Sequence, residues 1–258
     1  MKWLRMRLDG REALGLLDGD EVWVHEGDLF TSLTPTSRRI PLAEVDWLTP
    51  CQPSKMIALW NNFAAAAEKN GWSRPAEPLY FLKAPSSFAA HRQAIPVPRG
   101  EVGRVAYEGE LAVVIGRRAR AVTPDQARDH IFGYTCANDV TAMELITRDA
   151  SFPQWARAKS FDGFGVFGPV IETDFDPAGA SLRTTVAGRE RQNYPLADMF
   201  FGPAELVSRL SQDMTLEPGD VILCGTSLGV LPMKPGSAVA VAIDGIGTLE
   251  NVYGEDAA

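Results

Sequence analysis

Residues 107–115 read Tyr-Glu-Gly-Glu-Leu-Ala-Val-Val-Ile, and this stretch decides the fold. Its second half, 110–115, has the composition of a β-strand. Side chains alternate between the two faces of a strand, so Glu108 and Glu110 are expected to point the same way. Two adjacent carboxylates repel each other and resist burial, and a hard divalent cation relieves both problems. Asp139 follows about thirty residues later and is the expected third ligand of Mg²⁺, Mn²⁺ or Ca²⁺.

The same glutamate pair has a simpler interpretation. A Glu-x-Glu sequence is more often a solvated pair on an exposed strand face than a metal site. Here the pair leads directly into the apolar run 111–115, which favours a half-buried strand.

The composition of the whole chain bounds its class. With 258 residues, 45% hydrophobic and 22% charged, the sequence predicts an ordinary soluble globular protein with one large domain, or a main domain with a small appendage. The net charge of −8 argues against nucleic acid or an anionic membrane surface as the main partner. No apolar stretch approaches the roughly 20 residues needed to span a bilayer.

The cysteines indicate the compartment. Cys51, Cys136 and Cys224 are scattered and odd in number, without metal or redox spacing. Reduced thiols are therefore expected. The first ten residues alternate charged and apolar side chains and lack a signal-peptide core, so the cytoplasm is the expected location.

Two parts of unequal size are expected along the chain. Residues 1–48 form a small β domain, because apolar and basic residues alternate in 4–8 and Asp-Gly pairs mark two hairpins. Residues 34–53, rich in Pro, Ser and Thr, are expected to be a connector. The larger domain spans 50–255.

The larger domain is expected to be mostly β with few helices, an α+β fold without βαβ rhythm. A capping box at 123–126 opens one helix, and an alanine run at 64–67 favours another that ends at Gly71. A further helix is expected over 203–212. The expected strands are 56–60, 79–82, 105–115, 165–171, 182–186, 221–224 and 239–243.

Seven segments, in order, resemble the fumarylacetoacetate hydrolase superfamily over about residues 50–252. They read YFLKAPSS (80–87), YEGELAVVIGR (107–117), GYTCANDVTA (133–142), AKSFD (158–162), LEPGDVI (216–222), CGT (224–226) and IDGIGTLEN (243–251). The resemblance implies a mixed β-roll, usually homodimeric and often with a small N-terminal β domain. It also implies metal-assisted cleavage or rearrangement of small-molecule 2-oxo acids and 1,3-dicarbonyls.

The resemblance assigns roles to particular residues. Glu108, Glu110 and Asp139 would hold Mg²⁺ or Mn²⁺, and the Lys159 ammonium would stabilise developing negative charge. The turn at Gly225 and Thr226 would bind a substrate carboxylate. The remaining candidates for contacts with the substrate are Lys83 and Ser86 at the pocket mouth, with Phe81 and Met143.

The chain departs from the family where hydrolytic members carry a His with a nearby Glu that activate water. Residues 61–68 hold no histidine; Ala64 or Ala65 takes its position, and Glu68 is either the partner glutamate or the solvated end of a helix. Three explanations stay open. The chain is a natural decarboxylase or tautomerase, or another residue such as His91 supplies the base. The third is an altered or silent form that binds substrate without turnover.

A second departure follows Asp139. The family often has Arg and Gln in the next residues, where this chain has Met143 and Ile146, which suggests a less anionic and more apolar ligand. The predicted function is a divalent-metal-dependent hydrolase that cleaves a C–C bond of an acylpyruvate-like substrate. The alternative is a metal-dependent decarboxylase or keto–enol tautomerase at the same site.

Overall fold

The structure is a computed structural model that describes residues 1–254. Strands dominate and the helices are short, so the predicted α+β, mostly β fold class is confirmed. The strands are β1 (Lys2–Leu8), β2 (Arg11–Asp18), β3 (Glu21–Asp28), β4 (Ser32–Pro41), β5 (Asp46–Leu48), β6 (Met56–Trp60), β7 (Leu79–Lys83), β8 (Phe88–Ala89), β9 (Val105–Ala106), β10 (Gly109–Ile115), β11 (Ile131–Asp139), β12 (Thr141–Ala142), β13 (Gly165–Glu172), β14 (Ser181–Val186), β15 (Arg189–Pro195), β16 (Val221–Leu223), β17 (Ser237–Ile243) and β18 (Gly247–Tyr253).

The helices are α1 (Ala64–Asn70), α2 (Pro124–Ala127), α3 (Met143–Ile146), α4 (Trp155–Lys159) and α5 (Pro203–Asp213). Single 3₁₀ turns occupy Leu42–Glu44, Pro85–Ser87, Arg128–His130, Pro177–Gly179 and Leu196–Asp198. Within residues 1–254, no helix has the length and apolarity that crossing a bilayer requires.

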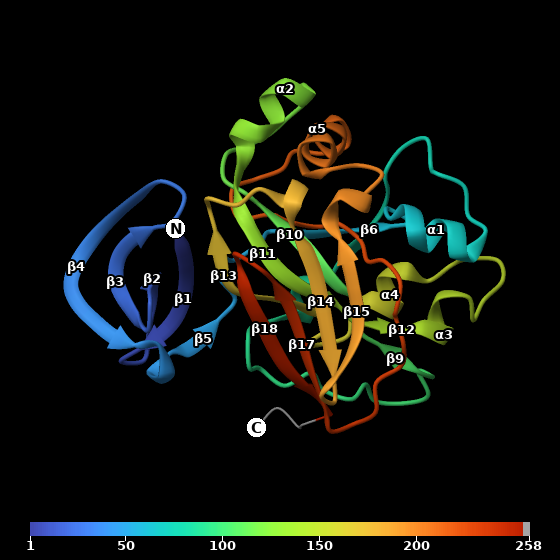
Figure 1. Cartoon of the computed structure of the whole chain (residues 1–258), viewed down its shortest axis with the longest axis horizontal. Coiled ribbons are helices and arrows are strands. Elements are labelled where there is room, and N and C mark those ends of the chain that lie inside the picture. The colour runs from blue at the N-terminus through green and yellow to red at the C-terminus, as the bar shows by residue number, and fades with distance from the viewer. Residues whose placement is uncertain (255–258) are drawn as a thin grey trace.

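A long mixed sheet and a four-stranded sheet make up the larger part of the molecule (Figure 1). The long sheet runs in the order β4-β3-β2-β1-β13-β11-β10-β16-β6-β7. The second sheet runs β15-β14-β17-β18 and lies across β10, β11 and β13, while α1, α3 and α4 gather at one side. The strands with the acidic residues of interest, β10 and β11, therefore lie in the middle of the sheet.

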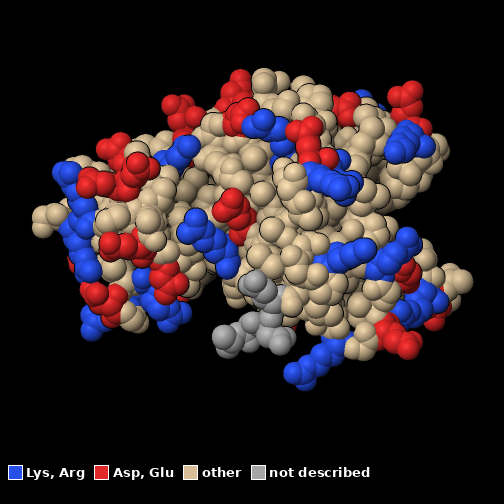
Figure 2. Space-filling model, turned by 60° about the horizontal axis from the view of Figure 1, so that its bottom comes forward, with Lys and Arg blue, Asp and Glu red and all other residues tan. Residues whose placement is uncertain are grey.

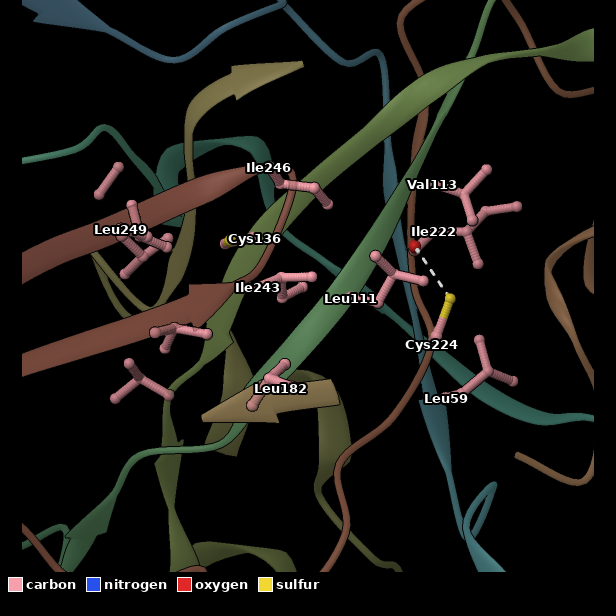
Figure 3. Packing of buried hydrophobic residues seen from close by; sticks show 14 of the residues in the cluster. Leu59, Leu111, Val113, Cys136, Leu182, Ile222, Cys224, Ile243, Ile246 and Leu249 are labelled. Atoms are coloured by element: carbon pink, nitrogen blue, oxygen red, sulfur yellow. Dashed lines mark hydrogen bonds between the residues drawn. The ribbon is translucent and has the colours of Figure 1, made fainter. Parts of the chain in front are cut away.

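Strand β10 is buried on both faces, which explains its uninterrupted apolar run. Leu111 and Val113 belong to the core cluster that includes residues of the four-stranded sheet, and Figure 3 shows Leu111 near Ile243 and Val113 beside Ile222. The alternate residues, including Ala112, belong to a second apolar cluster on the other face. This alternation with period two fixes the register of β10, because a slip of one residue would exchange the two faces.

The N-terminal strands β1 to β4 form a meander at one end of the long sheet, where β1 pairs with β13. The junction is short: β1 pairs with β13 only at Lys2 with Glu172 and at Trp3 with Ile171. On the face drawn in Figure 2, basic and acidic side chains are interspersed and form no large patch of one sign. The predicted end of the larger domain, residue 255, lies outside the described residues.

Most of the helices and strands expected from the sequence are present. Two expectations need correction and one detail is confirmed. The expected strand 105–115 is interrupted, because β9 ends at Ala106 and β10 begins at Gly109. The expected connector 34–53 is wrong in its first part, since β4 continues to Pro41. Strand β4 lies at the edge of the sheet. A proline is tolerated there because its missing N–H can face the side that has no neighbouring strand. The capping box at α2 is confirmed, with Thr123 N–H donating to Gln126 Oε1 at 3.1 Å.

His91 lies between the N-terminal meander and the larger sheet. Its Nδ1 accepts a hydrogen bond from Glu250 N–H at 3.0 Å, and its ring packs edge-on against Trp47 with centroids 4.8 Å apart. Burial, and to a lesser degree the charge of Arg92, lower the pKa of His91 to about 4. It lines a cavity at this junction, away from the acidic residues, so its place does not support a role as the catalytic base.

This buried histidine predicts a dependence of stability on pH. The folded pKa of His91 is below its ordinary value of 6.5, so the unfolded chain binds the proton more readily. Stability from His91 is complete above pH 6.5 and falls as the pH drops toward 4, by about 1–3 kcal/mol. We expect urea unfolding to show a larger loss between pH 7 and 4.5 for the wild type than for His91→Asn. Equal losses would contradict the assignment.

Candidate metal centre and active site

Three carboxylates converge where β10 and β11 lie side by side. One oxygen from each of Glu108, Glu110 and Asp139 lies within 4.8 Å of the others. Glu110 is on β10, Asp139 ends β11, and Glu108 precedes β10. Although Glu108 is outside the strand, its carbonyl oxygen accepts from Asp139 N–H at 2.9 Å and its own N–H donates to Asn138 at 2.9 Å. The backbone therefore fixes the approach of these ligands.

Two buried lysines surround the acidic group. Lys159 Nζ donates to Glu108 Oε1 at 2.9 Å and to Asp139 Oδ2 at 2.6 Å. Lys83 Nζ donates to the other oxygen of Asp139, and its side chain is fully buried. The sequence predicts Lys83 at the pocket mouth. Instead it lies behind Asp139, where it can orient that carboxylate and does not line the cavity.

The pKa shifts at the site follow from burial and these charges. Burial raises the pKa of Glu110 well above its ordinary value, and the charges of Asp139 and Glu108 add to the rise. Burial alone would raise the pKa of Asp139, but Lys159 and Lys83 outweigh it and lower that pKa. Burial opposes the charge of Lys159, yet the three carboxylates raise its pKa above the ordinary value. In the metal-free site these carboxylates therefore favour the charged form of Lys159.

The donor set fits a divalent cation. Glu110 is fully buried, and its Oε2 accepts from Gly225 N–H at 2.7 Å. Its Oε1 is also buried but has no hydrogen-bond partner within residues 1–254. An unpaired buried carboxylate oxygen costs stability, and a cation bound by all three carboxylates would satisfy it. Such an ion supplies Lewis-acid polarisation of a chelated carbonyl group.

Gly109, between the two glutamates, is held on three sides. Its N–H donates to Gln192 Oε1 at 3.0 Å, and its carbonyl accepts from Tyr194 at 2.6 Å and Thr226 at 2.9 Å. A Cβ at this position would clash with Thr184 Oγ1, so only glycine fits. These contacts from β14 and β15 position both glutamates. No pattern in the sequence predicts these contacts with Gly109, since β15 is polar and lacks apolar alternation.

The turn after β16 holds Gly225 and Thr226 close to the site. Gly225 has φ +87°, a left-handed conformation that favours glycine, and it directs its N–H at Glu110. The Thr226 hydroxyl donates to Gly109 and accepts from Gln192 Nε2 at 2.8 Å. The neighbouring Ser227 hydroxyl is buried beside the cavity without a partner among the described residues.

A cavity of about 380 Å³ opens over this centre. Glu108, Lys159 and Thr226 form its polar end. The rest of the wall comes from β6, α1, β7, the α3–α4 region and the loop after Thr226. Its apolar residues include Leu59, Trp60, Ala66, Trp72, Phe81, Met143, Ile146, Trp155, Leu228 and Val230.

Two family models match the chain. The model described as fumarylacetoacetate (FAA) hydrolase C-terminal matches residues 55–253, and the model described as Rv2993c-like, N-terminal matches residues 1–50. The chain belongs to the fumarylacetoacetate hydrolase superfamily. The resemblance seen in the sequence is thereby confirmed, and so is membership of an enzyme superfamily.

Several proteins of this superfamily resemble the chain along most of its length. The 5-carboxymethyl-2-hydroxymuconate delta-isomerase of Mycobacterium smegmatis has a TM-score of 0.90 at 36% identity and covers 99% of this chain and 100% of its own. The oxaloacetate tautomerase of Bacillus subtilis (strain 168) is 36% identical over 83% of this chain and 74% of its own. A maleylpyruvate hydrolase from Sphingobium sp. SYK-6, in complex with manganese(II) and pyruvate, has a TM-score of 0.80 at 26% identity, with coverages of 99% and 100%.

Some of the remaining predicted site residues of this fumarylacetoacetate hydrolase homologue line the cavity, and others do not. Phe81 and Met143 line the cavity. Ser86 and Glu68 are exposed and do not line it. Helix α1 turns Ala66, Lys69 and Asn70 toward the cavity, whereas Ala64 lies off the wall. The position that faces the cavity, and at which a lid histidine could act, is therefore 66 and not 64 or 65.

Proposed function

We propose that the protein catalyses a divalent-metal-dependent keto–enol tautomerisation or decarboxylation of a 2-oxo acid or 1,3-dicarbonyl substrate. The observation that carries the proposal is the convergence of Glu108, Glu110 and Asp139 beneath the cavity, with Glu110 Oε1 buried and unpaired. Tautomerisation passes through an enolate, and so does loss of CO₂ from a carboxylate β to the chelated carbonyl group. The enolate needs its negative charge stabilised but needs no activated water.

The chain's own groups match this chemistry. Glu108, Glu110 and Asp139 would hold Mg²⁺ or Mn²⁺, and water and substrate would supply the remaining ligands. Calcium accepts more oxygen ligands and suits three carboxylates less closely. The Lys159 ammonium, 2.6 Å from Asp139, adds a second positive charge beside the polar end of the cavity. The N–H groups and Ser227 hydroxyl of the turn after Gly225 would bind the substrate carboxylate.

The wall of α1 favours these reactions over hydrolysis. The residues that α1 presents to the cavity are Ala66, Lys69 and Asn70, and no histidine or carboxylate is among them. A positioned general base contributes about 10²- to 10⁴-fold to a hydrolytic rate. Hydrolysis of an acylpyruvate, the first function predicted from the sequence, is the second candidate. The likeness to a maleylpyruvate hydrolase supports it.

The test follows an acylpyruvate and oxaloacetate in the presence of Mn²⁺ or Mg²⁺. We expect accelerated exchange between keto and enol forms, seen as a change in enol absorbance, or release of CO₂, and a loss of both after treatment with EDTA. Carboxylate and ketone fragments without CO₂ would select the second candidate. Undiminished activity of the metal-free protein would overturn the proposal in both forms.

Several expectations from the sequence analysis stay proposals. A homodimer is expected, and light scattering should then give about twice the chain mass of 28.1 kDa. A cytoplasmic location and the absence of nucleic-acid and membrane partners also stay predictions.

A further inference from the structure

Four aromatic side chains line the cavity beyond its polar end. We call Trp60, Trp72, Phe81 and Trp155 the aromatic wall. They come from separate segments: β6, the loop after α1, β7, and the start of α4. The rings are in mutual contact. Ring centroids are 4.9 Å apart for Trp60 and Trp72, 5.8 Å for Trp60 and Trp155, and 5.4 Å for Phe81 and Trp155.

The aromatic wall is not part of the closed core. None of its four members is fully buried, and Trp72 is 41% exposed. Large aromatic surfaces left open in a cavity indicate a ligand-binding surface. Phe81 and Trp155 stack with an interplanar angle of 19°, so each covers part of one face of the other, and a flat group would pack against an outer face of the pair.

The aromatic wall reaches the reacting end of the site. The Lys159 ammonium lies 5.1 Å from the centroid of Phe81 while it donates to Glu108 and Asp139. A substrate held at the carboxylates by its oxygens would therefore direct its other end along these rings. Met143, Ile146 and Leu228 extend the apolar surface around them.

The charges of the site indicate how many carboxylates the substrate carries. Glu108, Glu110 and Asp139 contribute three negative charges, and Lys83 and Lys159 contribute two positive charges. A divalent cation brings the centre to +1, which one substrate carboxylate neutralises. No arginine lines the cavity within residues 1–254, and its one further basic residue is Lys69, with an exposed side chain on the last turn of α1. A second substrate carboxylate would thus face apolar rings instead of a buried cation.

We infer that the substrate is a mono-anionic 2-oxo acid or 1,3-dicarbonyl acid whose far end is an aromatic ring or another flat apolar group. That group packs on the aromatic wall, and Trp155 and Phe81 determine the preference for it. This inference rests on the tautomerisation form of the proposed function, because that function assigns the chelating end of the substrate and a mono-anionic 2-oxo acid has no carboxylate β to its carbonyl group to lose.

The test measures binding of three probes to the Mn²⁺-loaded protein by calorimetry and by quenching of tryptophan fluorescence. The probes are pyruvate, 2-oxoglutarate and phenylpyruvate, which differ in the group attached to the 2-oxo acid. We expect phenylpyruvate to bind about 10- to 100-fold more tightly than pyruvate, and 2-oxoglutarate to gain no more than a few-fold. Trp155→Ala should remove most of the gain for phenylpyruvate and leave pyruvate within a few-fold of the wild type, while Trp155→Phe should retain part of the gain.

A matched control is Trp23→Ala, since Trp23 stacks under Arg39 on the N-terminal meander and is not on the cavity. Equal affinities for pyruvate and phenylpyruvate, or tightest binding of 2-oxoglutarate, would overturn the inference and leave the proposed function standing. Failure of all three probes to bind in the presence of Mn²⁺ would overturn both. A gain for phenylpyruvate that survives in Trp155→Ala and in Trp155→Phe alike would show that the aromatic wall does not determine the preference.

Discussion

Glu110→Gln is expected to abolish activity and to lower the affinity for Mn²⁺ by at least about 100-fold, while the fold remains intact. Glu110 is the one carboxylate of the three with a buried oxygen that is unpaired among residues 1–254, so the ion would satisfy a group that no described residue reaches. Glutamine has the same shape and can still accept from Gly225 N–H, the bond that Glu110 Oε2 makes at 2.7 Å. It removes a charge that burial disfavours, and thermal unfolding of the metal-free variant should occur at the same or a higher temperature.

The measurement is a Mn²⁺ titration followed by calorimetry, combined with thermal unfolding with and without Mn²⁺. The wild type should gain thermal stability from the ion and the variant should not. Glu190→Gln is the control, because Glu190 is an exposed residue of β15 and its substitution removes the same charge away from the site. If Glu110→Gln bound Mn²⁺ as tightly as the wild type, the assignment of the metal centre would be wrong.

Strands could be predicted from the sequence where their burial requires a continuous or alternating run of apolar residues. Strand β10 is covered on both faces and carries an unbroken apolar run, and β6 and β17 are similarly rich in apolar residues. Strand β15 escaped prediction because it is a polar edge strand at one end of the four-stranded sheet. Strand β11, the strand of Asp139, was also missed, since Gly133 and the polar residues near its end interrupt the apolar pattern.

The site, too, has residues that could be predicted from the sequence and residues that could not. The three carboxylates could be proposed because Glu108 and Glu110 lead directly into an apolar run, which favours a half-buried strand over the solvated pair that a Glu-x-Glu sequence more often forms. The places of Lys83 and Thr226 could not be derived, since they depend on β7 and the turn after β16 reaching the same point from distant parts of the sequence. The helix α1 shows the limit most clearly. A run of four alanines carries no pattern that distinguishes one helix face from another, and the structure alone selects Ala66.

Ala66→His, combined with Lys69→Glu, is expected to raise hydrolytic C–C cleavage of an acylpyruvate by about 10²- to 10⁴-fold. Residues 66 and 69 are neighbours on one face of α1, and both line the cavity. A histidine at 66 would lie on the cavity wall, where it could take a proton from a water molecule in the cavity. A glutamate at 69 could orient the imidazole, whereas the native ammonium would disfavour its charged form. The measurement is the rate of appearance of carboxylate and ketone fragments with Mn²⁺ present.

Ala64→His with the same Lys69→Glu change is the matched control. It has the same cost in helix propensity, about 0.5 kcal/mol or less, and adds the same imidazole to the same helix, but off the cavity wall. A gain confined to position 66 would show that the centre can already perform the later steps of hydrolysis and lacks a base for water. Equal gains at 64 and 66 would contradict the assigned orientation of α1. If both variants fold, bind Mn²⁺ and stay inactive as hydrolases, the cavity excludes the attacking water by its shape. Enolate chemistry without water would then be what this arrangement of carboxylates and lysines supports.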